Sequence, residues 1–82
     1  MLDLATLGRL IAQHRSAKRL TQAELARRAR IGRSTLDALE NGRAPELGFG
    51  KIRRILASIG LTLKVTEANF GRHTLEDLIA ES

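Results

Sequence analysis

Residues 21–42, TQAELARRARIGRSTLDALENG, contain the pattern that decides the fold of this chain. Thr21 and Glu24 form a capping box, in which each side chain accepts a hydrogen bond from the backbone N–H of the other at the start of a helix. Helical spacing of apolar residues follows, is interrupted at Gly32, resumes, and ends at Gly42. Helices this short are unstable alone. The stretch therefore predicts two packed helices joined by a tight turn.

Three pieces of this stretch resemble the phage-repressor or Xre-type helix-turn-helix family. They are LTQAELA at 20–26, IGRSTL at 31–36 and LENG at 39–42, and they align with the family without a gap. Two positions depart from the family pattern. The family usually has Gly at the position of Arg30, where a left-handed backbone costs Arg about 1 kcal/mol. It usually has Ser or Thr at the position of Gly32, and Gly as a helix cap costs only a few tenths of a kcal/mol.

Length and composition indicate one small domain. The chain has 82 residues and no Cys, so it has neither a disulfide framework nor a thiolate metal site. It also has no apolar run long enough for a membrane span or a signal peptide. We therefore expect a protein without membrane association that is cytoplasmic, and the resemblance implies a bacterial protein found on the nucleoid when it is bound to DNA.

The positive charge is concentrated in one part of the chain. The formal net charge is +5, but residues 9–54 alone hold twelve Lys and Arg side chains against four acidic ones. A basic surface on a helix-turn-helix is what binding to DNA phosphates requires. Charge alone would fit a solvated basic surface equally well. Charge together with the motif favours DNA binding.

Helical periodicity extends on both sides of the motif. Residues 3–18 predict an amphipathic first helix, and residues 47–59 predict a later helix that stops at Gly60. The glycines are expected at the ends of such elements. The buried stripe of the later helix is expected to consist of Phe49, Ile52, Ile55, Leu56 and Ile59. The fold class expected is all-α, a compact repressor-like domain of four to five helices over residues 1–60.

Residues 61–67, LTLKVTE, predict the one β-strand of the chain. Leu61, Leu63 and Val65 alternate with polar residues, which is typical of a strand with one buried face. A single strand leaves its backbone groups unpaired, so we expect it to pair with the same strand of a second copy in a homodimer. The alternative is a strand packed only on its own helices.

The layout up to about residue 67 is similar to the HipB-like antitoxins, whose dimers share such a strand. This similarity is looser than that of the helix-turn-helix motif. Residues 68–82 are expected to form a linker and a short C-terminal helix or mobile tail.

The resemblance places the second helix of the motif in the major groove of double-stranded DNA, where its first residues face base edges. Arg33 is expected to bind a guanine through two hydrogen bonds. Asp37 would repel phosphate, so it should face a cytosine amino group or pair with a neighbouring Arg. The residues expected to read bases are Arg33, Ser34, Thr35, Asp37 and Ala38.

A second group of residues is expected to contact DNA phosphates. The resemblance implies that Gln22 acts as a phosphate clamp at the start of the first motif helix, where the helix N-terminus favours anions. It also implies that Arg15 pairs with Glu40 and contacts phosphate secondarily. The full expected set is Gln22, Arg15, Arg43 and Lys51.

The sequence contains no phosphate-binding glycine loop, no Cys/His ligand cluster and no nucleophile with a nearby base. We therefore expect no enzyme, no catalytic residue, no cofactor and no metal. Two functions are compatible with these patterns. The first is a transcriptional repressor that binds a palindromic operator as a dimer and is the autoregulating antitoxin of a HipBA-like pair, with a HipA-like toxin kinase as partner. The alternative is a free-standing Xre-type regulator with no toxin partner.

Overall fold

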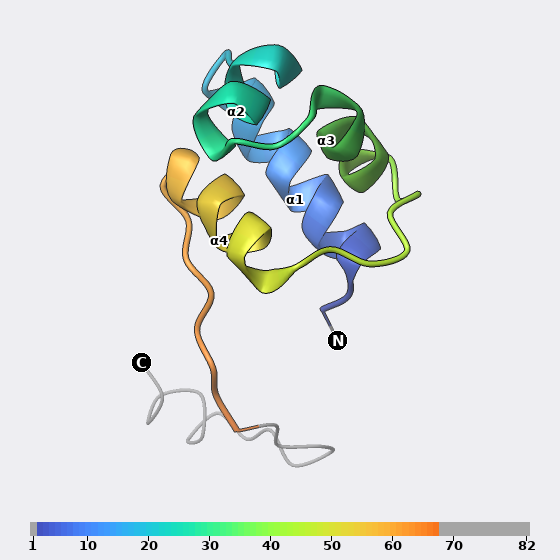
Figure 1. Cartoon of the computed structure of the whole chain (residues 1–82). Coiled ribbons are helices and arrows are strands. Elements are labelled where there is room, and N and C mark those ends of the chain that lie inside the picture. The colour runs from blue at the N-terminus through green and yellow to red at the C-terminus, as the bar shows by residue number, and fades with distance from the viewer. Residues whose placement is uncertain (1, 68–82) are drawn as a thin grey trace.

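A computed structural model describes residues 2–67 of the chain, and four α-helices make up the fold of this part (Figure 1). The helices are α1 (Leu4–Ala17), α2 (Gln22–Ala29), α3 (Arg33–Glu40) and α4 (Phe49–Ser58). The two motif helices predicted from residues 21–42 are α2 and α3, so the all-helical class and the motif are confirmed. The expected C-terminal helix lies outside the described residues.

The first two helices begin at side-chain caps. The Asp3 carboxylate accepts a hydrogen bond from the Thr6 backbone N–H at 2.8 Å at the start of α1. At the start of α2, the Thr21 hydroxyl accepts from the Glu24 N–H at 3.0 Å, and the Glu24 carboxylate accepts from the Thr21 N–H at 3.3 Å. These backbone hydrogen bonds hold the pKa of both Asp3 and Glu24 below its ordinary value. The capping box predicted from sequence is confirmed.

Each of these four helices ends in the same backbone arrangement, a residue with positive φ followed by a residue whose N–H bonds back to the last turn. Gly42 and Gly60 occupy this position after α3 and α4, at φ of 71° and 75°. Arg19 and Arg30 occupy it after α1 and α2, both at φ of 56°. The left-handed backbone expected at Arg30 is thus confirmed, whereas that of Arg19 was not anticipated.

Replacing Arg30 with Gly should raise the free energy of unfolding by about 0.5–1 kcal/mol. The left-handed backbone costs Arg about 1–2 kcal/mol, and the greater freedom of Gly in the unfolded chain offsets about half of the gain. Urea denaturation followed by circular dichroism measures the change. The matched control is Arg27→Gly within α2, which should lower the stability by about 0.5–1 kcal/mol. Equal losses for both variants would contradict the strain assigned to Arg30.

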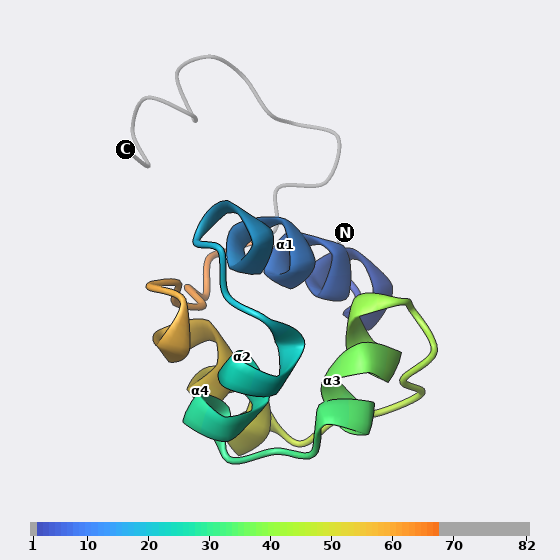
Figure 2. The ribbon, with the colours of Figure 1, turned by 90° about the horizontal axis from the view of Figure 1, so that it is seen from above.

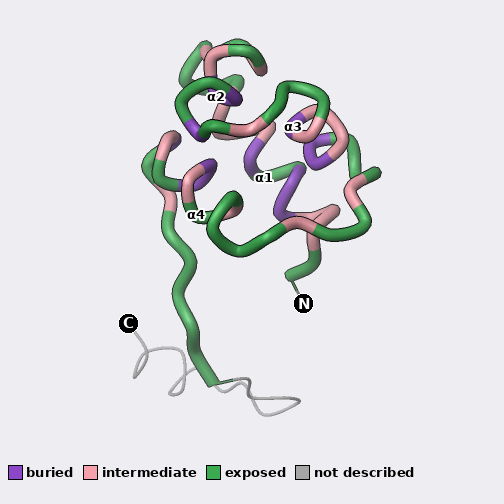
Figure 3. Tube along the Cα trace, in the orientation of Figure 1, coloured by how far each residue is buried: buried purple, intermediate pink, exposed green. Residues whose placement is uncertain are grey.

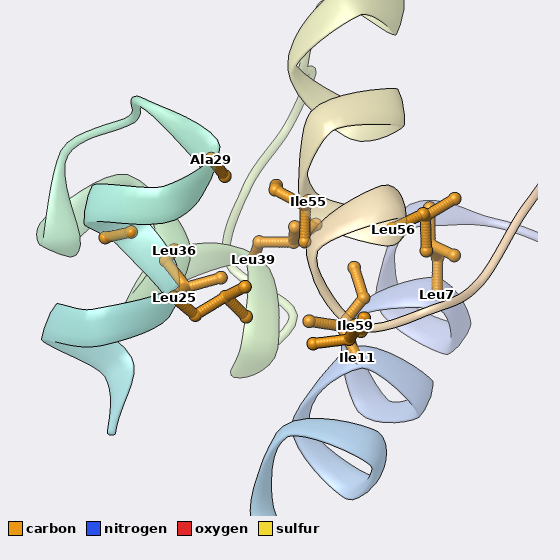
Figure 4. Close-up of a cluster of buried hydrophobic side chains, with 10 residues drawn as sticks. Leu7, Ile11, Leu25, Ala29, Leu36, Leu39, Ile55, Leu56 and Ile59 are labelled. Atoms are coloured by element: carbon orange, nitrogen blue, oxygen red, sulfur yellow. The ribbon is translucent and has the colours of Figure 1, made fainter. Parts of the chain in front are cut away.

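The core is formed by side chains from α1, α2, α3 and α4 together rather than by one pair of helices. Helix α2 packs against both α3 and α4, while α1 packs against α3 (Figure 2). In Figure 4, Leu7 of α1 lies beside Leu56 of α4, and Leu25 of α2 lies beside Leu36 of α3. The buried apolar residues are Leu7, Ile11, Leu25, Ala26, Ala29, Leu36, Leu39, Ile55, Leu56 and Ile59.

Helix α1 approaches α3 closely at Gly8. A Cβ atom added to Gly8 would overlap the carbonyl oxygen of Leu39 in α3 and would lie 2.7 Å from the Leu39 carbonyl carbon. Only a residue without a side chain therefore allows α1 to lie this close to α3. The expectation that the glycines lie at element ends was wrong for Gly8, whereas Gly50 does lie in the first turn of α4.

Helix α4 differs from its predicted form at its first turn. The helix begins at Phe49 with Gly48 as its cap, two residues later than expected, and Phe49 is 63% exposed rather than buried. The reason is that the first turn of α4 extends past the edge of the core. Ile55 is buried, as expected, and so are Leu56 and Ile59.

Residues 61–67 follow α4 as an extended segment that is neither helix nor strand (Figure 3). Leu61 packs partly against the core, and residues 62–67 are exposed. No β-strand is present between residues 2 and 67, because these residues offer the segment no second strand with which to form a hydrogen-bonded ladder. Pairing of this segment with a second copy remains a prediction.

Candidate nucleic-acid interface

The first turn of α3 presents polar side chains to solvent. Gly32 occupies the cap position before α3 and has no side chain with which to cap the helix. The first two residues of α3, Arg33 and Ser34, are exposed. Both line a shallow hollow of about 400 Å³ together with Gln22, from the start of α2, and Asp37, one turn further along α3. The structure thus brings three of the five predicted base-reading residues and one predicted phosphate contact onto one surface.

The remaining two predicted base-reading residues do not line this hollow. Thr35 and Ala38 are half-buried, whereas Leu36 and Leu39 of the same helix are fully buried. The helical repeat places the buried leucines and the polar residues on different faces of α3. The leucines therefore anchor α3 in the core, while Arg33, Ser34 and Asp37 remain accessible. This face of α3 is the part of the motif that can approach another molecule.

Asp37 is the centre of a hydrogen-bond network on this surface. Its carboxylate forms an ion pair with the Arg43 guanidinium at 2.6 Å and accepts hydrogen bonds from the side-chain amides of Gln22 at 3.1 Å and Asn41 at 3.0 Å. The hydrogen bond from Gln22, followed by the charge of Arg43, lowers the pKa of the Asp37 carboxyl. Of the two alternatives considered from sequence, pairing with a neighbouring Arg is the one that the free chain adopts.

The expected pair of Arg15 and Glu40 is confirmed. Arg15 Nε and Nη2 donate to the two carboxylate oxygens of Glu40 at 2.7 and 3.0 Å, and Nη1 donates to the Leu20 carbonyl oxygen at 2.7 Å. The exposed fractions of the two side chains are 17% for Arg15 and 4% for Glu40. The hydrogen bond to Glu40 raises the pKa of Arg15. The pair therefore ties α1 to the end of α3, and two of the five guanidinium N–H groups remain for a further contact.

Gln22 bridges the two acidic side chains of α3. Its amide nitrogen donates to Asp37 Oδ1 at 3.1 Å and to Glu40 Oε1 at 3.0 Å. The sequence placed Gln22 at the start of α2 but did not reveal these bonds, because both acceptors lie in another helix. The contact fixes the start of α2 against the exposed face of α3.

Two basic residues of α4 differ in their surroundings. Lys51 lies exposed in the first turn of α4. Arg54, in contrast, is not merely solvated, because its Nε donates to the Ala29 carbonyl oxygen at 2.8 Å, at the end of α2. The last carbonyl groups of a helix have no partner within the helix, so Arg54 satisfies one of them and joins α4 to α2.

An apolar surface lies on a different part of the molecule. It is a hollow of about 250 Å³ between α1, the end of α4 and the segment that follows α4. Its exposed apolar residues include Leu2 and Leu10, and Leu63 of the predicted strand lies at its edge with 38% exposure. Val65, further along the segment, is 97% exposed. Leu63 and Val65, two of the three residues predicted to form the dimer, are thus available for contact with another chain, whereas Leu61 packs partly against the core.

Comparison with known families gave one match. The model of the family described as a helix-turn-helix domain matches residues 6–68, which begin within α1 and include α2, α3, α4 and the whole of the segment 61–67. No curated protein and no solved structure gave a significant match.

Within residues 2–67, no helix is long and apolar enough to cross a membrane, and no group of three or more His, Asp or Glu side chains is placed to hold a metal ion.

Proposed function

Because the chain belongs to the helix-turn-helix domain family, we propose that it is a sequence-specific transcriptional repressor that binds double-stranded DNA through α3. The observation that carries this proposal is the exposed first turn of α3, where Arg33 and Ser34 share one surface with the start of α2. A helix presented in this way fits the major groove with its N-terminal residues at the base edges.

The proposed roles follow from charge and exposure. Arg33 binds a guanine through its two outer N–H groups, and Ser34 contacts a neighbouring base. Lys51 and Arg43 contact phosphates on either side of the groove, with Arg43 exchanging its ion pair with Asp37 for a phosphate. The two free N–H groups of Arg15 provide a further phosphate contact. Thr35 and Ala38, which are half-buried, contribute shape and an apolar contact rather than a hydrogen bond.

We propose that the protein binds DNA as a homodimer that is joined through residues 61–67. The exposed apolar side chains of Leu63 and Val65 and the unpaired backbone of this segment support the proposal. Two α3 helices related by two-fold symmetry would read half-sites about one turn of duplex apart, so the operator would be roughly palindromic.

The apolar hollow beside Leu63 supports a second protein contact besides the homodimer. On this basis we propose that the repressor is the antitoxin of a HipBA-like pair, which represses its own promoter and holds a HipA-like toxin kinase. The alternative is a free-standing Xre-type regulator whose hollow is filled by its own second copy. A kinase-sized gene that neighbours or overlaps this one would favour the antitoxin.

The test is a fluorescence-anisotropy titration of the protein on its own upstream DNA and on scrambled DNA, at two salt concentrations. Specific binding at moderate salt, with two chains per site, is the expected result. Weak binding that is equal on both DNAs and disappears at the higher salt concentration would mean that the basic surface attracts DNA only non-specifically. That result would overturn the proposal. The mass of the free protein in solution checks the dimer independently.

Arg33→Ala should lower the affinity for the specific site about tenfold to a hundredfold, since one bidentate contact to guanine contributes about 1–3 kcal/mol of discrimination. The affinity for scrambled DNA should fall much less, because only one of many charges is lost. Arg28→Ala, which removes the same charge from an exposed position of α2, is the matched control and should lower both affinities to a similar, small extent. An equal loss on both DNAs for Arg33→Ala would make Arg33 a phosphate contact.

A further inference from the structure

The orientation of the Gln22 side-chain amide is determined by its two acceptors. The amide nitrogen lies 3.1 Å from Asp37 Oδ1 and 3.0 Å from Glu40 Oε1. Ionised carboxylates only accept hydrogen bonds, so the group that faces them must be the NH2 and not the carbonyl oxygen. Each of the two N–H bonds of the amide is therefore directed at one carboxylate.

The surroundings hold these two carboxylates in place. Glu40 is held by Arg15 through both of its oxygens and is almost fully buried. Asp37 accepts a hydrogen bond from Asn41, which remains in place when Arg43 turns to a phosphate, and the hydrogen bond from Gln22 lowers the pKa of Asp37. Turning the Gln22 amide around would place its carbonyl oxygen against two negative charges. The NH2 group is thus fully occupied inside the protein.

The one polar group that Gln22 retains for a partner is its carbonyl oxygen. No hydrogen bond to this oxygen is present among the described residues, and Gln22 lines the hollow that it shares with Arg33 and Ser34. A DNA phosphate is itself only an acceptor and cannot bind to a carbonyl oxygen. In the major groove, the donors that a carbonyl oxygen can accept from are the amino groups of adenine and cytosine.

We propose that Gln22 is a specificity-determining residue that accepts a hydrogen bond from the amino group of an adenine or cytosine, next to the base read by Arg33, and is not a phosphate clamp. This inference rests on the proposed function, in which α3 occupies the major groove. It revises the role implied by the family resemblance, because that role needs the N–H donors that Asp37 and Glu40 occupy here.

The experiment is a selection of binding sites from random duplex DNA by the wild-type protein and by Gln22→Met, which keeps the length of the side chain and removes its hydrogen bonds. Enrichment of one motif by the wild-type protein supports the proposed function. The variant is then expected to enrich the same motif with the preference for adenine or cytosine lost at a single position, and to bind the wild-type site about tenfold more weakly. Gln13→Met, at an exposed position of α1, is the matched control and should change neither.

A second measurement needs no variant and distinguishes the two bases. Each adenine of the selected site is replaced in turn by purine, and each cytosine by 2-pyrimidinone, which removes the amino group alone. The wild-type protein should lose about tenfold in affinity at one of these positions, and Gln22→Met should lose nothing there. The base at that position identifies the amino group.

Three results would overturn the inference while leaving the proposed function intact. In the first, Gln22→Met enriches the same motif and binds it with unchanged affinity. In the second, Gln22→Met binds all sequences more weakly to the same extent, and ethylation of one phosphate that interferes with binding of the wild-type protein no longer interferes with binding of the variant. In the third, no removal of an amino group weakens binding by the wild-type protein. A wild-type protein that enriches no motif would overturn the proposed function and the inference together.

Discussion

Gly8→Ala is expected to lower the free energy of unfolding by about 2–3 kcal/mol. The added methyl group overlaps the Leu39 carbonyl group, which belongs to the backbone of α3 and cannot rotate away as a side chain would. Helices α1 and α3 must therefore move apart. Such overpacking costs about 1–3 kcal/mol, and because backbone must move, we place Gly8→Ala at the upper end of that range. The higher helix propensity of Ala, about 1 kcal/mol, offsets part of the cost.

The same substitution at a second helical glycine is the control. In Gly50→Ala the nearest atom outside the helix backbone is Arg54 Nη1 at 3.8 Å, an ordinary contact with a flexible side chain. This variant should be as stable as the wild type or more stable by up to about 1 kcal/mol. Both are measured by urea denaturation followed by circular dichroism. A Gly8→Ala protein that matches Gly50→Ala in stability would show that α1 and α3 are not in close contact at this point.

The local features of the fold could be predicted from the sequence because they depend on residues close together in the chain. The capping box of Thr21 and Glu24 and the stop at Gly42 are of this kind. The left-handed Arg30 could also be expected, but only through the resemblance, since Arg itself gives no signal for that conformation. Arg19 adopts the same conformation, and neither pattern nor resemblance indicated it.

The contacts between elements could not be predicted in the same way. Gly8 carried one signal, a glycine inside an otherwise helical pattern, which often has a packing reason. Its contact with Leu39 depends on how α1 crosses α3, however, and periodicity does not determine a crossing. The exposure of Phe49 has a similar cause, because the period places Phe49 on the apolar stripe whereas the edge of the core depends on the other helices.

The candidate site shows the same division. That Arg33 and Ser34 begin an exposed turn followed from their place in the motif. That Gln22 donates to two acidic residues of α3 depends on the angle between α2 and α3, and that Asp37 holds Arg43 depends on how the chain turns after α3. The chemistry left to each side chain is therefore visible only in the structure, and for Gln22 it leads to the proposed contact with a base amino group.

The buried pair of Arg15 and Glu40 leads to the second large effect, a loss of about 3 kcal/mol of unfolding free energy in Arg15→Met. Removing one partner of a buried ion pair costs about 3–5 kcal/mol, because the remaining charge keeps the cost of its burial. The low end applies here, since the Arg15 side chain is 17% exposed and Gln22 still donates to Glu40. A domain of this size has a total stability of about 5 kcal/mol, so a substantial part of it depends on this pair.

Two further variants separate the charge from the packing. Arg9→Met removes an exposed Arg from the same helix and should change the stability by less than about 0.5 kcal/mol. The double variant Arg15→Met with Glu40→Met removes the unpaired charge as well, and we expect it to recover at least half of the loss, because apolar replacements of a buried pair are often neutral. Urea denaturation of the three proteins measures these differences. If the double variant were no more stable than Arg15→Met, the loss would come from the Leu20 carbonyl group, to which Arg15 also donates, and not from the buried charge of Glu40.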